Sequence, residues 1–437
     1  MVTPTPRRTV VALGAGGLAL SLALAGCSAG GDSADGKITL SYLVDNQEAT
    51  VDTANALADT FMADNPDITI KVETRPQGAD GDNLVKTRLA TGEMSDVFAY
   101  NSGSLLQALS PDKTLVDLSG EDWASKLDDN FVKSVSTGDA LYGVPMGQSM
   151  AGAVIYNKDV YADLGLEIPT TWDEFISNSE TIKASGIAPI VQTYGDTWTS
   201  QLFVLGDFNN VLADDPDWAE AYTANERKYV DEPALAGFEH LQEAFDKGLY
   251  NEDFASATYA DGVSMVATGA GAQYPILTFA ASQLMTTNPE AADTVGTFPL
   301  PGPDADTNGL TVWMPGAVYI PNSTEGDKLE AAKKFVAFLV TPESCDIQSS
   351  TSSPQGPFVI DGCSLPDDVP AMISDLQPYF DEGKTNLALE FLSPIKGPAL
   401  EQITVAVGSG ITKAADGAAQ YDEDVVKQAQ QLGLEGW

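Results

Sequence analysis

The chain alternates between strand-like and helix-like spacing of its apolar residues. Residues 38–44 form a β-branched apolar run, and from Glu48 onward apolar side chains recur at helical spacing. Residues 68–72 then alternate as in a strand, and a second helix over 84–89 and a buried strand over 97–100 follow. This order predicts an α/β fold in which helices cover both faces of a mostly parallel sheet.

Such a sheet also predicts where a ligand binds. Ligands of open α/β sheets gather beyond the carboxyl ends of the strands. Asp45 and Asn46 follow the first predicted strand, and Asn101 follows the strand over 97–100. We therefore expect these loops to lie near any binding site.

Residues 1–26 have the features of an export signal. Arg7 and Arg8 precede an apolar stretch that is shorter than the about 20 apolar residues of a membrane span, and this stretch ends in small residues. Residues 24–27, Leu-Ala-Gly-Cys, resemble the bacterial lipobox, in which the cysteine becomes the N-terminus and carries a diacylglyceryl group. The alternative is a buried cysteine in a first helix. We expect a lipid anchor at Cys27, and a flexible tether over 27–36, where large apolar side chains are missing.

The formal net charge of −41 at pH 7 restricts the partners of the chain. A surface this acidic repels nucleic acid, anionic lipid and anionic ligands unless local cations override the field. We therefore expect no nucleic-acid partner, and we attribute the acidity to solubility outside the cell.

Cysteine and histidine usage argues against a metal or redox centre, so no cofactor is expected. Once Cys27 carries lipid, Cys345 and Cys363 remain as an even pair around a segment rich in Ser, Pro and Gly. We expect them to form a disulfide that stabilises the fold by roughly 3 kcal/mol. The single histidine, His240, lies off the apolar face of the helix predicted over 232–247, so we expect it on the solvated surface and not in catalysis.

Two further helices are predicted from their ends. Residues 328–340 are amphipathic and are followed by Thr341 and Pro342, which close the helix. Residues 170–174 form a capping arrangement at the start of another helix, and we assign Trp172 there to packing and not to a ligand site.

One longer segment carries a family resemblance. The sequence YNKDVYADLGLEIPTTWDEF, residues 156–175, closely resembles a stretch of the extracellular solute-binding proteins of carbohydrate ABC transporters, the family that contains the maltose-binding protein. The chain departs from the family pattern at Phe279, where Trp is usual, and at Gln273, where Met is usual. Other segments agree in order and spacing, and together they cover nearly the whole chain after Cys27: residues 95–98, 143–145, 269–279, 297–301, 316–323 and, as in actinobacterial members, 427–437.

The resemblance implies two α/β lobes that close on a ligand in the cleft between them, as in periplasmic binding proteins. It implies three crossings between the lobes, near Gln148, near Leu300 and inside the segment from Cys345 to Cys363. The disulfide would then lie beside a hinge. The implied lobe 1 comprises residues 37–147 and 301–350, and the implied lobe 2 comprises residues 148–300 and 351–437.

A neutral sugar needs polar partners for its hydroxyls and aromatic rings for its C–H faces. The loops expected at the cleft have this composition and contain no Arg or Lys. Trp198 and Trp313 lie in polar, Gly-containing loops, which favours the cleft over core packing, whereas Tyr100 and Phe279 fit either place. The expected ligand-binding residues are Asp45, Asn46, Glu48, Tyr100, Asn101, Gln148, Asp196, Trp198, Tyr274, Phe279, Trp313, Glu390 and Phe391.

The resemblance implies a substrate-binding lipoprotein on the extracellular face of the cell membrane. It would bind a neutral mono- or oligosaccharide without cleaving it and deliver it to the transmembrane subunits of an ABC permease. We expect a monomer without enzymatic activity. Two alternatives stay open: a secreted glycoside hydrolase, because the abundant acids could supply paired carboxylates, and a binding protein for a peptide or another small neutral solute.

Overall fold

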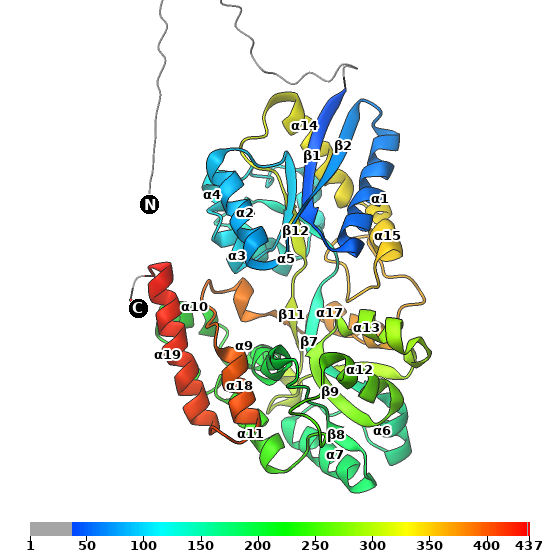
Figure 1. Cartoon of the computed structure of the whole chain (residues 1–437), viewed down its shortest axis with the longest axis vertical. Helices are drawn as coiled ribbons and strands as arrows, with labels where there is room; N and C mark the ends of the chain where they lie inside the picture. The colour runs from blue at the N-terminus through cyan, green and yellow to red at the C-terminus, as the bar shows by residue number, and fades with distance from the viewer. Residues whose placement is uncertain (1–36, 435) are drawn as a thin grey trace, which may run out of the picture.

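The computed structural model describes residues 37–434 and 436–437. These form two lobes, which lie one above the other in Figure 1, and each lobe has its own large β-sheet. The predicted export signal, Cys27 and the tether over 27–36 lie outside the described residues. Within the described part of the chain, no helix is long and apolar enough to cross a membrane.

Lobe 1 is built on a five-stranded sheet of order β2-β1-β3-β12-β6. β1 pairs with β2 and β3 in parallel, whereas β12 runs antiparallel to β3 and β6. Helix α1 buries Phe61, whose ring lies 5.2 Å from Phe335 of α14 between centroids. The helices and strands of lobe 1 are β1 (Ile38–Asp45), α1 (Glu48–Asp64), β2 (Ile68–Arg75), α2 (Gly78–Thr91), β3 (Val97–Tyr100), α3 (Ser104–Gln107), α4 (Pro111–Thr114), η1 (Asp122–Lys126), α5 (Asp129–Ser134), β4 (Ser136–Thr137), β5 (Ala140–Leu141), β6 (Gly143–Met146), β12 (Gly316–Tyr319), α14 (Gly326–Leu339) and α15 (Pro342–Thr351).

Lobe 2 has a six-stranded sheet around β7, which runs antiparallel to β9, β10 and β11. Its β8–β9 and β11–β13 pairs are parallel. A mostly parallel sheet is therefore wrong for lobe 2, because its central strand enters from lobe 1 and not from a local strand-helix-strand unit. Its helices and strands are β7 (Met150–Asn157), α6 (Lys158–Leu164), α7 (Trp172–Ser185), β8 (Ala188–Ile190), η2 (Thr197–Gln201), α8 (Leu202–Leu205), α9 (Phe208–Asp214), α10 (Trp218–Thr223), α11 (Ala236–Asp246), α12 (Tyr259–Thr268), β9 (Gly271–Leu277), α13 (Ala280–Thr287), η3 (Pro289–Ala291), β10 (Val295–Pro299), η4 (Ala305–Thr307), β11 (Leu310–Trp313), α16 (Ala371–Ser374), α17 (Gln377–Asp381), β13 (Thr385–Leu387), η5 (Leu389–Phe391), α18 (Leu400–Gly408) and α19 (Ala414–Leu432).

The first two passages of the chain between the lobes are short. Residues 147–149 join β6 to β7 and contain Gln148. The second passage lies at Met314 and Pro315, between β11 and β12. The expected crossing near Leu300 is wrong, because β10 and β11 both pair with β7. Residues 301–313 therefore lie with lobe 2.

The third passage follows Cys363 and does not lie inside the segment that the disulfide closes. Cys345 and Cys363 form the expected disulfide, with their Cα atoms 5.9 Å apart. Near the end of the enclosed segment, the Val359 carbonyl accepts the Asp128 N–H of lobe 1 at 3.0 Å. Only after Cys363 does the chain reach α16, which packs against β10 of lobe 2.

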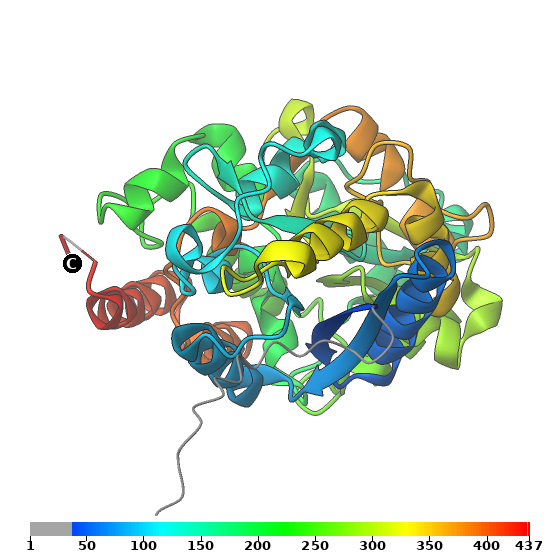
Figure 2. The ribbon, with the colours of Figure 1, turned by 90° about the horizontal axis from the view of Figure 1, so that it is seen from above.

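Helix α7 begins as predicted, whereas His240 is placed differently. Thr171 and Glu174 form a capping box, and Trp172 beside them is buried. His240 is only 9% exposed, because its ring stacks on Trp172. Its helix, α11, packs against α8, α18 and α19. The outermost of these, α19, runs along the outer side of lobe 2 (Figures 1 and 2). The prediction of a solvated histidine is therefore wrong.

Candidate functional site

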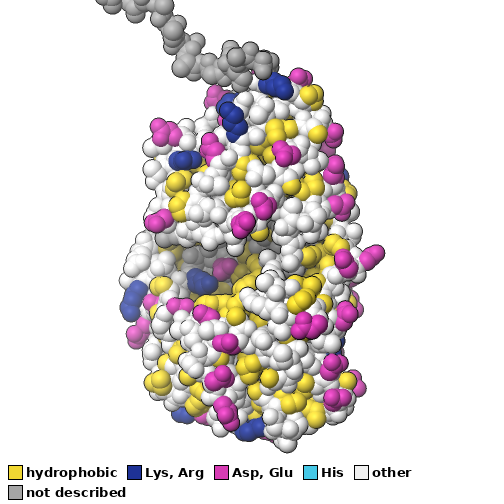
Figure 3. Space-filling model, turned by 45° about the vertical axis from the view of Figure 1, so that its right-hand side comes forward, with side chains coloured by type: hydrophobic (Ala, Val, Ile, Leu, Met, Phe, Trp, Pro, Cys, Tyr) yellow, Lys and Arg dark blue, Asp and Glu magenta, His cyan; other side chains and the backbone are white. Residues whose placement is uncertain are grey.

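A hollow separates the two lobes on the face of the molecule shown in Figure 3. Hydrophobic side chains gather along its lower edge, and basic and acidic side chains also face it. The two lobes lie on either side of this hollow. The passages at 147–149 and 314–315 connect them. The cleft thus has a lobe 1 wall, a lobe 2 wall and a hinge region at the passages.

Three half-buried aromatic side chains form one cluster on lobe 2. The Trp198 ring centroid lies 5.4 Å from that of Tyr259 and 5.7 Å from that of Phe279, and the last two are 5.6 Å apart. Trp198 and Phe279 are among the ligand residues predicted from the sequence, whereas Tyr259 is not. The signal that could have found it is the Thr258–Asp261 capping box, which starts α12 with this tyrosine.

Hydrogen bonds hold this aromatic cluster beside the first passage. The Asp196 carboxylate accepts the backbone N–H of Tyr259 at 2.7 Å, so Asp196 supports the cluster. The hydroxyl oxygen of Thr278, the neighbour of Phe279, accepts the N–H of Ala151 at 2.9 Å. Because Ala151 is the second residue of β7 after the passage, the cluster lies at the hinge side of the lobe 2 wall.

The carboxyl ends of β1, β2 and β3 form the lobe 1 wall. Asp45 and Arg75 stand in register on neighbouring strands, and the Arg75 guanidinium lies over the Tyr100 ring, 5.4 Å from its centroid. Arg75 is 7% exposed, and its Nε has no hydrogen-bond partner among the described residues. Burial raises the pKa of Tyr100 well above its ordinary value, and the Asp82 carboxylate adds to this shift.

The other lobe 1 candidates are polar residues on the surface. Asn46 and Glu48 are exposed around the start of α1, and Asn101 is exposed directly after β3. The Asn101 carbonyl accepts the Tyr319 hydroxyl at 3.0 Å, which fixes this loop to the strand that follows the second passage. The Asn101 loop therefore has a defined place beside the hinge region.

Gln148 and Trp313 lie at the two passages. Gln148 is 7% exposed, and its Nε2 has no hydrogen-bond partner among the described residues. A buried amide donor without an acceptor costs free energy, so this group suits a bound ligand or water. Trp313 ends β11 and is also 7% exposed. It lines a cavity of lobe 2 together with Glu390 and Lys396.

Phe391 makes a direct contact between the lobes. It follows Glu390 in η5 of lobe 2, and its ring and backbone lie against Gly103 in the loop after β3 of lobe 1. The two lobes therefore touch at one end of the region that holds the predicted ligand residues.

Two cations stand beside predicted ligand residues, although the predicted cleft loops contain none. Arg75 contributes from the end of β2, and Lys396 lies 3.3 Å from the Glu390 carboxylate. Both lie outside the loops named from the sequence and approach the site only in the folded chain. In the described part of the chain, no group of three or more His, Cys, Asp or Glu side chains could hold a metal ion.

Tyr274 lies in the interior of lobe 2. It is 0% exposed, and its hydroxyl lies 2.5 Å from the Thr193 hydroxyl. Gln273, one residue before it on β9, is equally buried and accepts the Tyr161 hydroxyl at 2.6 Å. Tyr274 therefore offers no exposed atom to a ligand in this structure.

Known proteins resemble this chain over most of its length. The sequence model of the bacterial extracellular solute-binding protein family matches residues 46–344. The multiple sugar-binding protein of Streptococcus mutans is 27% identical over 332 residues, which cover 74% of this chain and 76% of that protein. The melibiose/raffinose/stachyose-binding protein of Bacillus subtilis is 25% identical over 351 residues, which cover 77% of this chain and 78% of that protein.

Solved structures share the fold. A Bacillus subtilis binding protein in an open conformation has a TM-score of 0.77 at 18% identity, with 92% of this chain and 100% of that chain covered. A chitin oligosaccharide binding protein has a TM-score of 0.70 at 20% identity, with 90% and 99% covered. The two-lobed α/β fold is thus confirmed. Because the family match spans more than half of its length, this chain belongs to the bacterial extracellular solute-binding protein family.

Proposed function

We propose that this chain is the sugar-binding lipoprotein of an ABC importer. It captures a neutral sugar, an oligosaccharide in preference to a monosaccharide, and delivers it to the permease subunits. The observation that carries this proposal is the Trp198–Tyr259–Phe279 cluster, because three joined rings offer a broad surface to the C–H faces of a sugar. The names of the relatives, for multiple sugars and for melibiose, raffinose and stachyose, support the same ligand class.

The proposed contacts divide by chemistry. The aromatic cluster and Phe391 pack on the sugar rings, and Trp313 and Tyr100 border them. Asp196 acts through Tyr259, and Tyr274 through packing, so neither touches the ligand. The proposed partners for the sugar hydroxyls are Asp45, Asn46, Glu48, Asn101, Gln148 and Glu390.

The two cations do not make this cleft an anion site. Lys396 is paired with Glu390 at 3.3 Å, and Arg75 has Asp45 beside it in register and the Tyr100 ring under its guanidinium. The net charge of −41 adds a field that opposes anions. An uncharged ligand fits this balance.

Binding would act through closure of the lobes. Ligand contacts from both walls stabilise the closed form relative to the open form, and the permease would recognise the closed form. A diacylglyceryl group on Cys27 would hold the monomeric protein on the extracellular face of the membrane, where it stays within reach of the permease.

A thermal-shift screen of the mature protein against mono-, di- and trisaccharides tests this function. At least one neutral sugar should raise the Tm in proportion to the logarithm of its concentration, because ligand binding stabilises only the folded state. Chromatography of the same samples should recover the sugar intact. Cleavage of the sugar would support a glycoside hydrolase instead, and stabilisation by peptides alone would support another solute class.

A further inference from the structure

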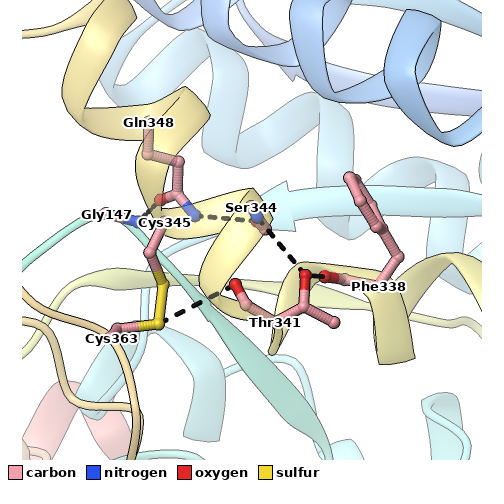
Figure 4. The surroundings of a disulfide bond; sticks show 7 residues. All are labelled: Gly147, Phe338, Thr341, Ser344, Cys345, Gln348 and Cys363. Carbon is pink, nitrogen blue, oxygen red and sulfur yellow. Dashed lines mark hydrogen bonds between the residues drawn. A yellow bond between two sulfur atoms is a disulfide. The ribbon is translucent and has the colours of Figure 1, made fainter.

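The peptide groups on both sides of Gln148 are held by one distant segment of the chain. On the first side, the Gly147 N–H donates to Oε1 of Gln348 at 2.7 Å. Gln348 is 2% exposed, and its Nε2 donates to the Ser344 hydroxyl at 3.1 Å. Figure 4 shows the Gln348 carboxamide between Gly147 and Ser344, next to the disulfide.

On the second side, Ser149 is held twice by one carbonyl. The Ser149 N–H donates to the Pro357 carbonyl at 2.9 Å, and the Ser149 hydroxyl donates to the same oxygen at 2.8 Å. Gly356 approaches so closely that a Cβ atom there would lie 2.2 Å from the Ser149 carbonyl oxygen. Only glycine fits at this approach.

Both partners belong to residues 345–363, the segment that the disulfide closes. Its later part is fixed to lobe 1, because the Asp361 N–H donates to the Lys126 carbonyl at 2.7 Å. Its middle reaches lobe 2, because the Thr278 hydroxyl donates to the Gln355 carbonyl at 2.7 Å. The segment therefore contacts lobe 1, the first passage and the residue next to Phe279.

Gln148 itself is the unsatisfied member of this arrangement. Its backbone neighbours are fixed, and the residue is 7% exposed, yet its Nε2 has no acceptor among the described residues. Native structures leave few buried donors unpaired, and a sugar hydroxyl or ring oxygen would accept this one.

We infer that residues 345–363 are a clamp that presents the Gln148 carboxamide to an oxygen of the ligand. Gln348 is then a positioning residue, because it acts through Gly147 and touches no ligand. This inference rests on the proposed function for the identity of the ligand. It adds that the disulfide-closed segment sets ligand affinity through the first passage.

The affinity test uses three variants of the full mature chain. Gln148→Ala removes the proposed ligand contact, and Gln348→Leu removes the acceptor for Gly147. Ser350→Ala is the matched control, because Ser350 is on the same helix but is exposed, and its hydroxyl donates to the Ile347 carbonyl and not to Gln348 or Gly147. The Tm of each variant reports its stability separately from its affinity.

Calorimetric titration with the sugar that most stabilises the wild type gives the Kd. We expect about tenfold weaker binding for Gln148→Ala and for Gln348→Leu, and a change within about twofold for Ser350→Ala. Because Gln348 acts through Gln148, the double variant should bind no more weakly than Gln148→Ala. Wild-type affinity in Gln348→Leu, or additive losses in the double variant, would overturn the clamp.

Hydrogen exchange tests the clamp without any sugar. The Gly147 amide should exchange about tenfold faster in Gln348→Leu, and the Gly147 and Ser149 amides should both do so when Cys345 and Cys363 are replaced by Ser. Ser350→Ala should exchange like the wild type. If these changes occur while no sugar binds, the proposed function fails and the clamp stands. Unchanged exchange overturns the clamp whatever the sugar screen gives.

Discussion

His240 stacks on Trp172, with ring centroids 3.8 Å apart and planes inclined by 16°. The two residues come from α11 and the start of α7, so this contact joins two helices of lobe 2. Burial lowers the pKa of His240 to about 3, which keeps the ring uncharged at neutral pH. Its Nδ1 lies 3.9 Å from Oδ1 of Asp207. The pair belongs to the core of lobe 2.

Asp207 makes the stability of lobe 2 depend on pH. It is 2% exposed and accepts the Asn210 side-chain N–H at 2.8 Å, and burial raises its pKa to about 7. The folded state thus keeps a proton that the unfolded chain releases near pH 3.9. The contribution of Asp207 to the free energy of unfolding is therefore fully present below about pH 3.9 and is lost as the pH rises through about 7.

Asp207→Asn keeps the acceptor for Asn210 and removes this titration. We expect the variant to have a higher Tm than the wild type at pH 8, with the difference disappearing toward pH 5. Each kcal/mol gained corresponds to roughly 2–4 °C. Circular-dichroism melts from pH 5 to 8 measure this, and Asp214→Asn, on the exposed end of α9, is the control. A Tm difference that is the same at every pH contradicts the assignment.

Local patterns predicted the elements that depend on local chemistry. The strand over 38–44, the following helix and the Thr171–Glu174 capping box need only nearby residues, and all three form. The even number of cysteines after Cys27 was also enough to predict the disulfide, since Cys345 and Cys363 are joined. The crossing near Leu300 failed, because the pairing of β10 with β7 is decided by long-range register and not by the residues around it.

The site was predictable in kind and only partly by residue. Trp198 was named because it stands in a polar, Gly-containing loop, and Phe279 because it takes the place of a Trp that is usual in the family, whereas Tyr259 joins them only through the fold. Arg75 was not predicted for the same reason. Its strand, β2, is separated from the strand of Tyr100, β3, by β1, so only the folded sheet brings the two side chains together. Aromatic composition therefore indicated the ligand class, while the contacts depended on tertiary structure.

Trp198→Ala should weaken sugar binding by about tenfold or more with a small effect on Tm, because Trp198 is half-buried and its loss removes aromatic area from the cluster. Isothermal titration calorimetry with the sugar measures the Kd. Trp437→Ala serves as the control, because this tryptophan contacts Tyr222 at the outer side of lobe 2. Wild-type affinity after loss of Trp198 removes this residue from the proposed site.

Replacing Cys345 and Cys363 together by Ser should lower the free energy of unfolding by about 3 kcal/mol, since the two residues are 18 apart in sequence and their bond restricts the unfolded chain. Urea unfolding followed by fluorescence measures the loss. Wild-type protein unfolded with a reducing agent present should give the same midpoint as the double variant. Equal stability of the oxidised wild type and the double variant contradicts the expected contribution.

Gly103→Ala should hold the lobes apart. Gly103 has φ +66°, and an added Cβ would lie 2.7 Å from Cδ1 of Phe391 and 2.9 Å from the Glu390 carbonyl, both on the opposite lobe. We expect at least about tenfold weaker sugar binding, because closure is where both walls contact the ligand. Small-angle X-ray scattering should show a larger radius of gyration than for the wild type at saturating sugar.

Gly92→Ala is the control for backbone strain. Gly92 (φ +71°, ψ 19°) is in the left-handed α region, where a side chain costs about 1–2 kcal/mol, and nothing lies within 4 Å of the added atom. The backbone of Gly103 (φ +66°, ψ −138°) disfavours a side chain more strongly, so the comparison between the two variants rests on the Kd and the radius of gyration. Gly92→Ala should therefore lose stability while keeping the wild-type Kd and radius of gyration. If Gly103→Ala matches Gly92→Ala in both measurements, the contact between Gly103 and Phe391 has no part in closure, and the lobes meet the ligand without it.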